Sequence, residues 1–202
     1  MLTRLPNSEG KGGVSMLDLL VNALRQRPDR IVVGEIRRKE EAEVLFEAIH
    51  TGHSVYATVH ANSAKETVTR LTSPPIEVPK SMLPALQLII VQYRNRRSGL
   101  RRTFQVAEVT EDAQARILMQ YEPGKDLLKK VNESKALLGT LQLYTGFSSA
   151  EIKKDLAGKQ KVLKHLAKEN INTVETVGKV MAEYYTNFDS LMKQISKGKS
   201  VK

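Results

Sequence analysis

The chain has 202 residues and a formal net charge of +10, and it contains neither cysteine nor tryptophan. The lack of cysteine excludes a disulfide framework and a thiolate zinc site, which is typical of an intracellular protein. No apolar run approaches the roughly 18 residues that span a bilayer, and the N-terminus lacks the apolar segment of a signal peptide. We therefore expect one α/β domain with an appendage, without membrane insertion or an export signal.

The basic residues are distributed unevenly along the chain. Residues 1–121 contain 13 Arg and 4 Lys against 13 acidic residues, whereas residues 122–202 contain 15 Lys and no Arg against 9 acidic residues. Arginine is suited to bidentate binding of phosphate, while scattered lysines on helices usually mark a solvated face. This change of composition predicts an α/β domain over 1–121 and a helical subdomain over 122–202.

The first 62 residues predict an alternation of helix and strand. In chain order we expect a turn-rich loop over 1–13, a helix between Ser15 and Pro28, a strand over 31–33 followed by Glu35, a helix over 39–50, and a strand over 55–59 followed by His60. Three consecutive β-branched residues at 31–33 are typical of a short strand that is buried on both faces.

A strand, a crossover helix and a second strand predict a right-handed parallel unit. In such a unit Glu35 and His60 leave the sheet at the same edge, which is where open α/β sheets collect their ligands. We therefore expect these two side chains to act on one ligand. The alternative is a surface glutamate that follows an ordinary strand.

Later elements are marked by capping patterns and turns. We expect a helix capped by Ser63 and Glu66, a short helix and strand over 81–93, a hairpin around five arginines at 94–102, a strand over 115–121, and helices capped at Ser148 with Glu151 and at Asn172 with Glu175. The apolar stripes of the last helices predict packing faces, and the arginine-rich hairpin tip is expected to be solvated.

Three motifs stand in order at the start of the chain: LRQRPD at 24–29, IVVGEIR at 31–37, and TGH at 51–53 followed by TVHAN at 58–62. Together they resemble the secretion ATPase superfamily, the motors of type II and type IV secretion, type IV pili and archaeal flagella. The second motif is similar to its atypical Walker B box and the third to its His box. Arg27, the PPIEVP run at 74–79 and the tyrosines at 184–185 are similar to the archaeal branch.

This resemblance implies the site residues and the cofactors, ATP and Mg²⁺. By matching position, Glu35 is the carboxylate that orients water and supports Mg²⁺ through water, and His60 senses or stabilises the γ-phosphate. Arg25, Arg37 and Arg4 match arginines that the family uses near phosphates or across subunit interfaces.

The resemblance also implies a partial RecA-like P-loop NTPase core, followed by a hairpin and a small helical C-terminal subdomain. It implies a homo-hexameric ring for the intact parent, a polytopic membrane platform as partner, and a location at the cytoplasmic face of the membrane.

Simpler interpretations exist for several of these residues. Arg4 is equally well explained as a loop residue, and His53 is better explained as a turn residue that closes the crossover. A zinc site made by His50, His53 and His60 is disfavoured, because no acidic or thiolate ligand completes the set. Binding to nucleic acid is disfavoured, because only 5% of the residues are aromatic and no stacking motif is present.

The sequence departs from the family in one respect. No G-x-x-x-x-G-K-[ST] run, whose amides cradle phosphates, occurs in the 202 residues, and the Gly-rich stretch at 10–13 has neither the spacing nor the Ser/Thr. We therefore expect the C-terminal half of a motor domain, without ATP hydrolysis by the isolated chain and with an uncovered sheet edge that favours self-association. The alternative is a non-catalytic module that docks on a complete secretion ATPase or its platform.

Overall fold

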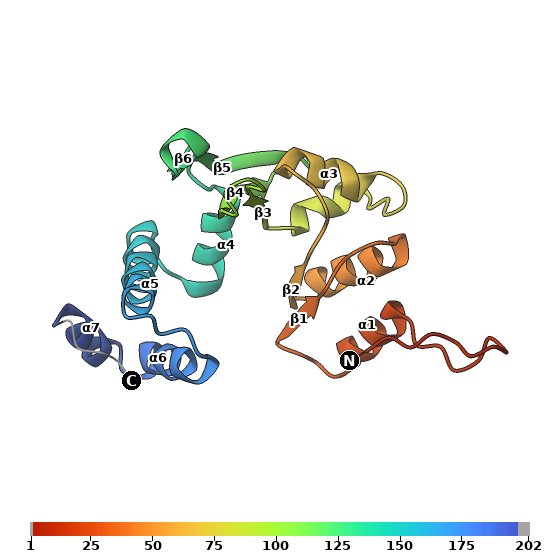
Figure 1. Cartoon of the computed structure of the whole chain (residues 1–202), viewed down its shortest axis with the longest axis horizontal. Helices are drawn as coiled ribbons and strands as arrows, with labels where there is room; N and C mark the ends of the chain where they lie inside the picture. Colours follow the sequence, from red (N-terminus) through yellow and green to blue (C-terminus); the bar gives the residue numbers. More distant parts are fainter. Residues whose placement is uncertain (1, 198–202) are drawn as a thin grey trace. The chain divides into compact units, whose positions relative to one another are not determined.

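The computed structural model describes residues 2–197, which divide into two compact units. Unit 1 extends to Leu137 and unit 2 begins at Leu138 (Figure 1). Unit 1 contains a parallel and an antiparallel sheet with helices, and unit 2 is helical. The predicted mixed α/β class, with a hairpin and a helical C-terminal part, is confirmed.

Unit 1 follows the predicted alternation closely. Its elements are α1 (Met16–Arg25), β1 (Arg30–Val33), α2 (Lys39–His50), β2 (Ser54–Ala57), α3 (Ala64–Thr72), the 3-10 helix η1 (Lys80–Ala85), β3 (Leu88–Arg94), β4 (Arg101–Val109), β5 (Ala115–Glu122), the 3-10 helix η2 (Pro123–Lys125) and β6 (Leu127–Lys130). The expected capping box at Ser15 and Asp18 opens α1.

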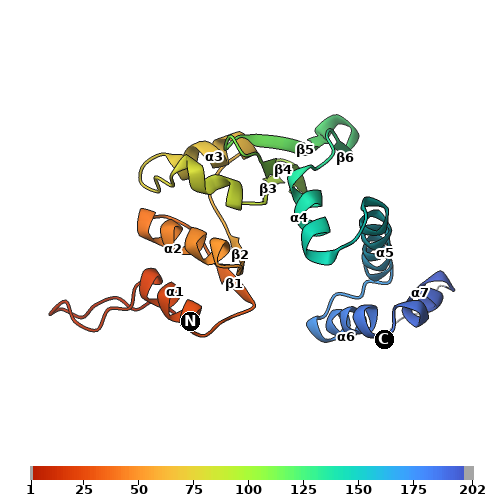
Figure 2. The ribbon, with the colours of Figure 1, turned by 180° about the vertical axis from the view of Figure 1, so that it is seen from behind.

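Strands β1 and β2 form a parallel pair, as predicted, in which Ile31 lies opposite Val55 and Val33 opposite Ala57. Helix α2 connects the two strands and packs beside them, with α1 next to it (Figure 2). Ile31 and Val33 are buried together with Leu45 of α2. Apolar packing on this side therefore determines which residues of the pair face inwards.

Burial of β1 on both faces is a prediction that proves wrong. The side chain of Val32 is 78% exposed, and that of Tyr56, opposite it on β2, is 57% exposed. In the described part of the chain the pair has only two strands, with α1 and α2 on the side of Ile31 and Val33. The alternating residues on the other side therefore remain open to solvent.

Strands β3 to β6 form an antiparallel sheet in sequential order. Ile89 and Val91 of β3 and Ala107 of β4 are buried in the same apolar cluster as Leu71 of α3 and Leu83 of η1. This cluster also contains the buried residues of β1, so unit 1 has one continuous core.

The structure places the division of the chain later than the boundary predicted at residues 121 and 122. That boundary falls inside β5, and β6 pairs with β5 through Tyr121 and Leu128. The lysine-rich composition thus begins while the chain is still part of the sheet, because Lys129 and Lys130 of β6 are both exposed. The change from arginine to lysine therefore marks a change in the exposed residues. It does not mark the end of unit 1, because β6 still pairs with β5.

A buried carboxylate holds the end of unit 1. Glu108 of β4 is 1% exposed, and its side chain accepts hydrogen bonds from Ser134 Oγ at 2.7 Å, from the Lys135 N–H at 3.2 Å and from the Ala136 N–H at 3.2 Å. Arg116 Nη1 lies 3.5 Å from the same carboxylate. The first turn of α4 (Ala136–Thr145) is therefore anchored to β4 by one side chain.

Unit 2 contains the remainder of α4 and three further helices, α5 (Ser149–Lys168), α6 (Val174–Thr186) and α7 (Phe188–Ser196). The expected capping box of Ser148 and Glu151 opens α5. The cap predicted at Asn172 is instead made by Thr173, whose hydroxyl accepts the Thr176 N–H at 3.3 Å. Both residue types can cap, and the one in extended conformation directly before the helix does so.

Most of the predicted apolar stripes of unit 2 are packing faces, and they meet in a second core, made of Val162, Leu166, Val180, Tyr184, Leu191 and Ile195. Leu163 and Val174, which belong to the predicted stripes, are instead 56% and 85% exposed. None of the helices described between residues 2 and 197 is both long enough and apolar enough to cross a bilayer.

Candidate active site

Three of the predicted site residues meet at one edge of the parallel pair. Glu35 follows β1 by two residues and His60 follows β2 by three, and because the strands are parallel both emerge at the same edge. Glu35 Oε1 lies 3.0 Å from His60 Nε2, and Arg37 Nε donates a hydrogen bond of 2.7 Å to Glu35 Oε2. We call Glu35, Arg37 and His60 the Glu35 cluster.

The two loops that carry this cluster are tied together by backbone and side-chain hydrogen bonds. The Ile36 N–H donates to the Thr58 carbonyl at 3.1 Å, and the Thr58 hydroxyl donates to the Gly34 carbonyl. These bonds continue the pairing of the strands beyond their ends. The spacing between Glu35 and His60 is therefore fixed by the main chain on both sides.

Helix α2 holds the third member of the cluster in place. Glu41, in the first turn of α2, accepts the backbone N–H groups of Arg37 and Arg38 at 3.0 and 3.2 Å. A carboxylate at this position satisfies donors that a helix N-terminus leaves open. The main chain at Arg37 is thereby fixed, and its guanidinium can reach back to Glu35.

The surroundings of Glu35 favour its charged form. The hydrogen bond from Arg37 holds the pKa of Glu35 below its usual value against the opposing effect of burial, and the charges of Arg37, His60 and Arg70 act in the same direction as the hydrogen bond. The side chain of Glu35 is 21% exposed, while those of Arg37 and His60 are 73% and 76% exposed. The site therefore combines the largely buried carboxylate of Glu35 with the exposed nitrogen groups of Arg37 and His60.

This set of groups fits a magnesium nucleotide. Mg²⁺ prefers oxygen ligands, keeps several waters, and is commonly held by one or two carboxylates together with substrate phosphates. Glu35 supplies one such carboxylate, and the donors of Arg37 and His60 suit phosphate oxygens. Among residues 2–197 no group of three or more His, Asp or Glu side chains forms an all-protein metal cage.

Arg70, which none of the sequence motifs indicated, belongs to the same region. Arg70 lies in the last turn of α3, and it lines with His60, Asn62 and Glu66 a cavity of about 720 Å³ in unit 1. Glu66 accepts the Asn62 N–H at 2.9 Å, which ties the His box to α3. Arg70 stands four residues after Glu66, and this helical spacing is the signal that places both on one face.

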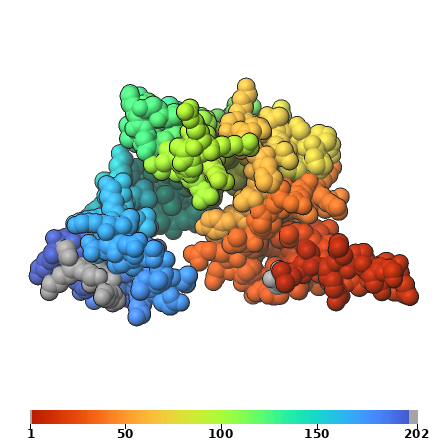
Figure 3. All heavy atoms as spheres, viewed as in Figure 1, coloured from red at the N-terminus to blue at the C-terminus, as the bar shows by residue number. Residues whose placement is uncertain are grey.

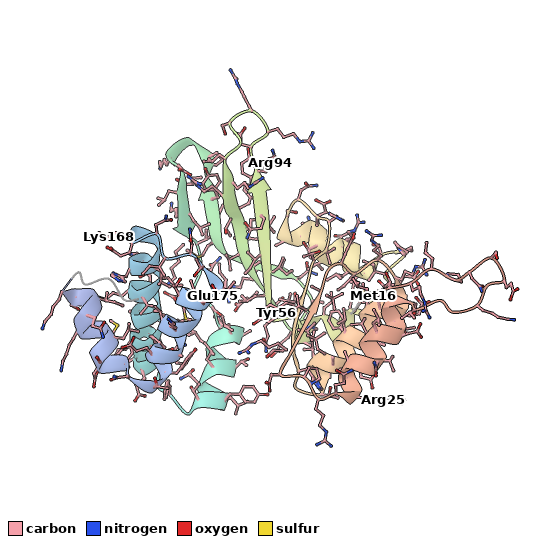
Figure 4. The ribbon with its side chains drawn as sticks, turned by 60° about the horizontal axis from the view of Figure 1, so that its bottom comes forward. Met16, Arg25, Tyr56, Arg94, Lys168 and Glu175 are labelled. Carbon is pink, nitrogen blue, oxygen red and sulfur yellow. The ribbon has the colours of Figure 1, made fainter. Side chains whose placement is uncertain are left out.

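Two of the predicted arginines are not brought to the Glu35 cluster. Arg25 ends α1 and precedes β1, whereas Glu35 follows the opposite end of that strand; Figure 4 labels Arg25 at the C-terminal end of α1. Arg4 forms an isolated bridge with Val14, and its Nε donates to the Gly12 carbonyl at 2.6 Å. Within this chain Arg4 closes a loop, in line with its simpler interpretation.

The proposed structural role of His53 agrees with its contacts. His53 Nδ1 lies 3.2 Å from both the Ala48 carbonyl and the Thr51 hydroxyl, at the C-terminal end of α2. The ring thus supports the turn that leads into β2.

Removal of the Arg37 guanidinium is expected to raise the pKa of Glu35 towards the 4.5 of an ordinary glutamate, because the largest stabilising contact of the carboxylate is lost. The measurement is an NMR titration of the Glu35 side-chain carboxyl in the Arg37→Gln variant. Arg70→Gln should give a smaller rise, and Arg38→Gln, a neighbouring exposed arginine, should leave the value unchanged. Equal titration curves for Arg37→Gln and the parent would show that Arg37 does not lower the pKa of Glu35.

Comparison with known proteins identifies the family. The family model described as type II/IV secretion system protein matches residues 2–189. The chain belongs to this family. The predicted membership of the secretion ATPase superfamily is thereby confirmed.

Relatives of this secretion family include archaeal and bacterial proteins. An uncharacterized protein of Methanocaldococcus jannaschii is 37% identical over 175 residues, which cover 83% of this chain and 64% of that protein. The type IV pilus assembly ATPase PilB of Pseudomonas aeruginosa is 44% identical over 87 residues, covering 43% of this chain and 15% of PilB. The chain thus spans less than two thirds of the length of either relative.

Two solved structures show local likeness to this family member. The ATPase DotB of Legionella pneumophila matches with a TM-score of 0.41 at 30% identity, over 49% of this chain and 29% of DotB. The pilus retraction motor PilT with bound ADP matches with a TM-score of 0.40 at 28% identity, over 68% of this chain and 36% of PilT.

Proposed function

We propose that the chain is the part of a secretion or pilus motor ATPase that carries the catalytic carboxylate. The observation that supports this is the Glu35 cluster, an ionised carboxylate that contacts both Arg37 and His60 at one edge of two parallel strands. The reaction is hydrolysis of ATP, and the parent protein uses it to move a membrane-embedded platform.

Each member of the cluster has a role in this proposal. Glu35 would hold Mg²⁺ and orient the attacking water, and His60 would donate to the γ-phosphate. Arg37 keeps Glu35 charged and correctly oriented. Catalysis of phosphoryl transfer consists mainly of such positioning and charge stabilisation. When bound, Mg²⁺ neutralises the charge that develops on the phosphates.

The remaining arginines are assigned to other places in the assembly. Arg70 lines the same cavity as His60 and adds positive charge to it. Arg25 and Arg4, which lie away from Glu35 in this chain, are proposed to act across a subunit interface. An arginine supplied by a neighbour contributes to catalysis only when subunits are aligned, as in a ring.

A phosphate cradle is the missing part of the site. Because no G-x-x-x-x-G-K-[ST] run occurs in the 202 residues, we propose that a P-loop from another polypeptide segment completes a RecA-like core with β1 and β2. The completed motor is a homo-hexamer at the cytoplasmic face of the membrane, with a polytopic platform protein as its partner. The family membership of the chain supports this assignment.

The test compares turnover of Mg-ATP by the 202-residue chain with turnover by the same chain joined to the P-loop half of a relative such as PilB. We expect only the background rate for the chain alone and steady hydrolysis for the joined protein. Hydrolysis by the isolated chain would contradict the need for a second segment. Tight binding of the chain to a complete ATPase, with a joined protein that stays inactive, would favour the docking module instead.

A further inference from the structure

The hairpin between β3 and β4 carries a concentrated positive charge that the Glu35 cluster does not use. Four of its arginines, which we call the arginine tip, are exposed, and their guanidinium groups have no ion pair or hydrogen bond with any residue that the structure describes. The arginine tip comprises Arg94, Arg96, Arg97 and Arg101. Figure 3 shows this segment, in lime green, on an outward face of unit 1.

The fifth arginine of the hairpin, Arg102, differs from the other four because it has an acidic partner in the chain. Arg102 donates from Nε and Nη2 to the two carboxylate oxygens of Asp126, each at 2.7 Å, and Tyr121 donates to the same carboxylate at 2.7 Å. The chain thus supplies a fitted acidic partner to the arginine that lies over the sheet. It supplies none to the arginine tip.

The loop that presents the arginine tip is ordered by its own hydrogen bonds. The side-chain oxygen of Asn95 accepts the N–H groups of Arg97 and Ser98 at 2.9 and 3.1 Å, and the Gly99 N–H donates to the Asn95 carbonyl at 2.8 Å. Gly99 has a φ of 72°, which a glycine adopts without strain. Figure 4 labels Arg94 where β3 enters this loop. The guanidinium groups are therefore presented from a fixed backbone.

Helix α2 carries a complementary surface. Glu40, Glu43 and Glu47, which we call the acidic stripe, stand at i, i+3 and i+7 and so share one face of the helix. All three are exposed, and within residues 2–197 none of their carboxylates takes part in an ion pair. The opposite face of α2 packs Leu45 and Phe46 into the core.

We propose that the arginine tip of one copy of this chain binds the acidic stripe of a second copy. The two surfaces carry opposite charge, both lack partners in their own chain, and a guanidinium can bind a carboxylate through two parallel hydrogen bonds. Nucleic acid or an anionic membrane would satisfy the arginines alone and would leave the acidic stripe without a partner.

A two-fold dimer would satisfy both surfaces of both copies at once, whereas a single contact leaves one free surface of each kind at the ends. Single contacts that repeat from copy to copy generate closed rings or open filaments. The contact is made of exposed charges, so it weakens as salt shortens the Debye length to about 8 Å at physiological ionic strength. This inference concerns assembly and holds independently of ATP hydrolysis.

The absence of native cysteine allows a direct test by disulfide cross-linking. A chain with Arg97→Cys is mixed at low salt with a chain with Glu43→Cys, under mild oxidation. We expect a cross-linked heterodimer in several-fold greater yield than from Arg97→Cys mixed with Glu111→Cys, a matched exposed glutamate outside the stripe. The yield should fall as salt is raised. Equal yields for the two mixtures at low salt would overturn the proposal.

Charge reversal provides a second measurement by sedimentation of the otherwise unmodified chain. Arg96→Glu with Arg97→Glu should abolish association at low salt, as should Glu43→Lys with Glu47→Lys in another chain. An equimolar mixture of these two variants should associate again, because each supplies the reversed partner of the other. Unchanged association of the arginine variant, with loss of its binding to vesicles of anionic phospholipid, would overturn the proposal in favour of a membrane contact.

Discussion

Replacement of Glu35 by glutamine is expected to lower ATP hydrolysis by the protein completed with a P-loop segment by about 10²- to 10⁴-fold. The amide has nearly the same shape but carries no charge. It therefore loses its electrostatic attraction to Arg37 and His60, the two groups that contact the Glu35 carboxylate at 2.7 and 3.0 Å. Its amide nitrogen also cannot accept a hydrogen bond from the attacking water that Glu35 is proposed to orient. The readout is steady-state release of phosphate with saturating Mg-ATP.

A matched control separates this effect from a general loss of charge. Glu111→Gln removes an exposed carboxylate in the turn between β4 and β5 and should leave hydrolysis unchanged. Binding of a fluorescent ATP analogue should remain within a few-fold of the parent in Glu35→Gln. A Glu35→Gln protein that hydrolyses ATP at the parent rate would remove Glu35 from the catalytic step.

The second large effect is expected at Glu108, a residue that plays no part in the proposed chemistry. Glu108→Ala should lower the free energy of unfolding of unit 1 by about 3 kcal/mol, since a hydrogen bond to a charged group contributes roughly 1.5–3 kcal/mol and this variant removes the acceptor of several. The donors are the Ser134 hydroxyl and the N–H groups of Lys135 and Ala136. Equilibrium unfolding in urea, followed by the NMR signals of β4 and β5, measures the change.

Two variants and one pH series test this account of Glu108. Glu108→Gln retains one acceptor oxygen and should be less destabilising than Glu108→Ala, whereas Glu111→Ala should fall within about 0.5 kcal/mol of the parent.

Burial acts to raise the pKa of Glu108, but hydrogen bonds from Ser134 and the following amides outweigh it and hold the pKa below the usual 4.5.

The lowered pKa gives a definite sign to the pH dependence. Stability from a carboxylate with a depressed pKa is fully present above the value of the unfolded chain and is lost as the pH falls through the folded value. The parent should therefore lose stability below about pH 4.5 more steeply than Glu108→Gln does. Parallel curves for the two proteins would show that Glu108 does not carry this contribution.

Local patterns were sufficient to predict the elements that position the Glu35 cluster. Apolar periodicity, a proline stop and a glycine at the helix end indicated the order of α1, β1, α2 and β2, and the parallel pairing follows from the crossover. Hence the meeting of Glu35 and His60 could be predicted. The ion pair of Arg37 with Glu35 was not predicted, because the sequence assigned Arg37 to phosphates or to a subunit interface.

Contacts between residues far apart in the sequence could not be predicted from these local patterns. The hydrogen bond of Thr58 to Gly34 and the approach of Arg70 arise only when separate loops are packed together. A glutamate within an apolar strand gave no sign that Glu108 would be buried, because its partners lie 26 to 28 residues later. The exposure of Val32 depends on which strands flank β1, and three β-branched residues carry no information on that point.

The register of the parallel pair has a consequence for the chemistry. Ile31 and Val33 are buried only while they stand opposite Val55 and Ala57. A slip of one residue would turn Val32 inwards, and it would also carry Glu35 about 3.3 Å along the strand, out of hydrogen-bonding reach of His60. The buried apolar side chains of the two strands thus set the separation of Glu35 and His60 through the strand register.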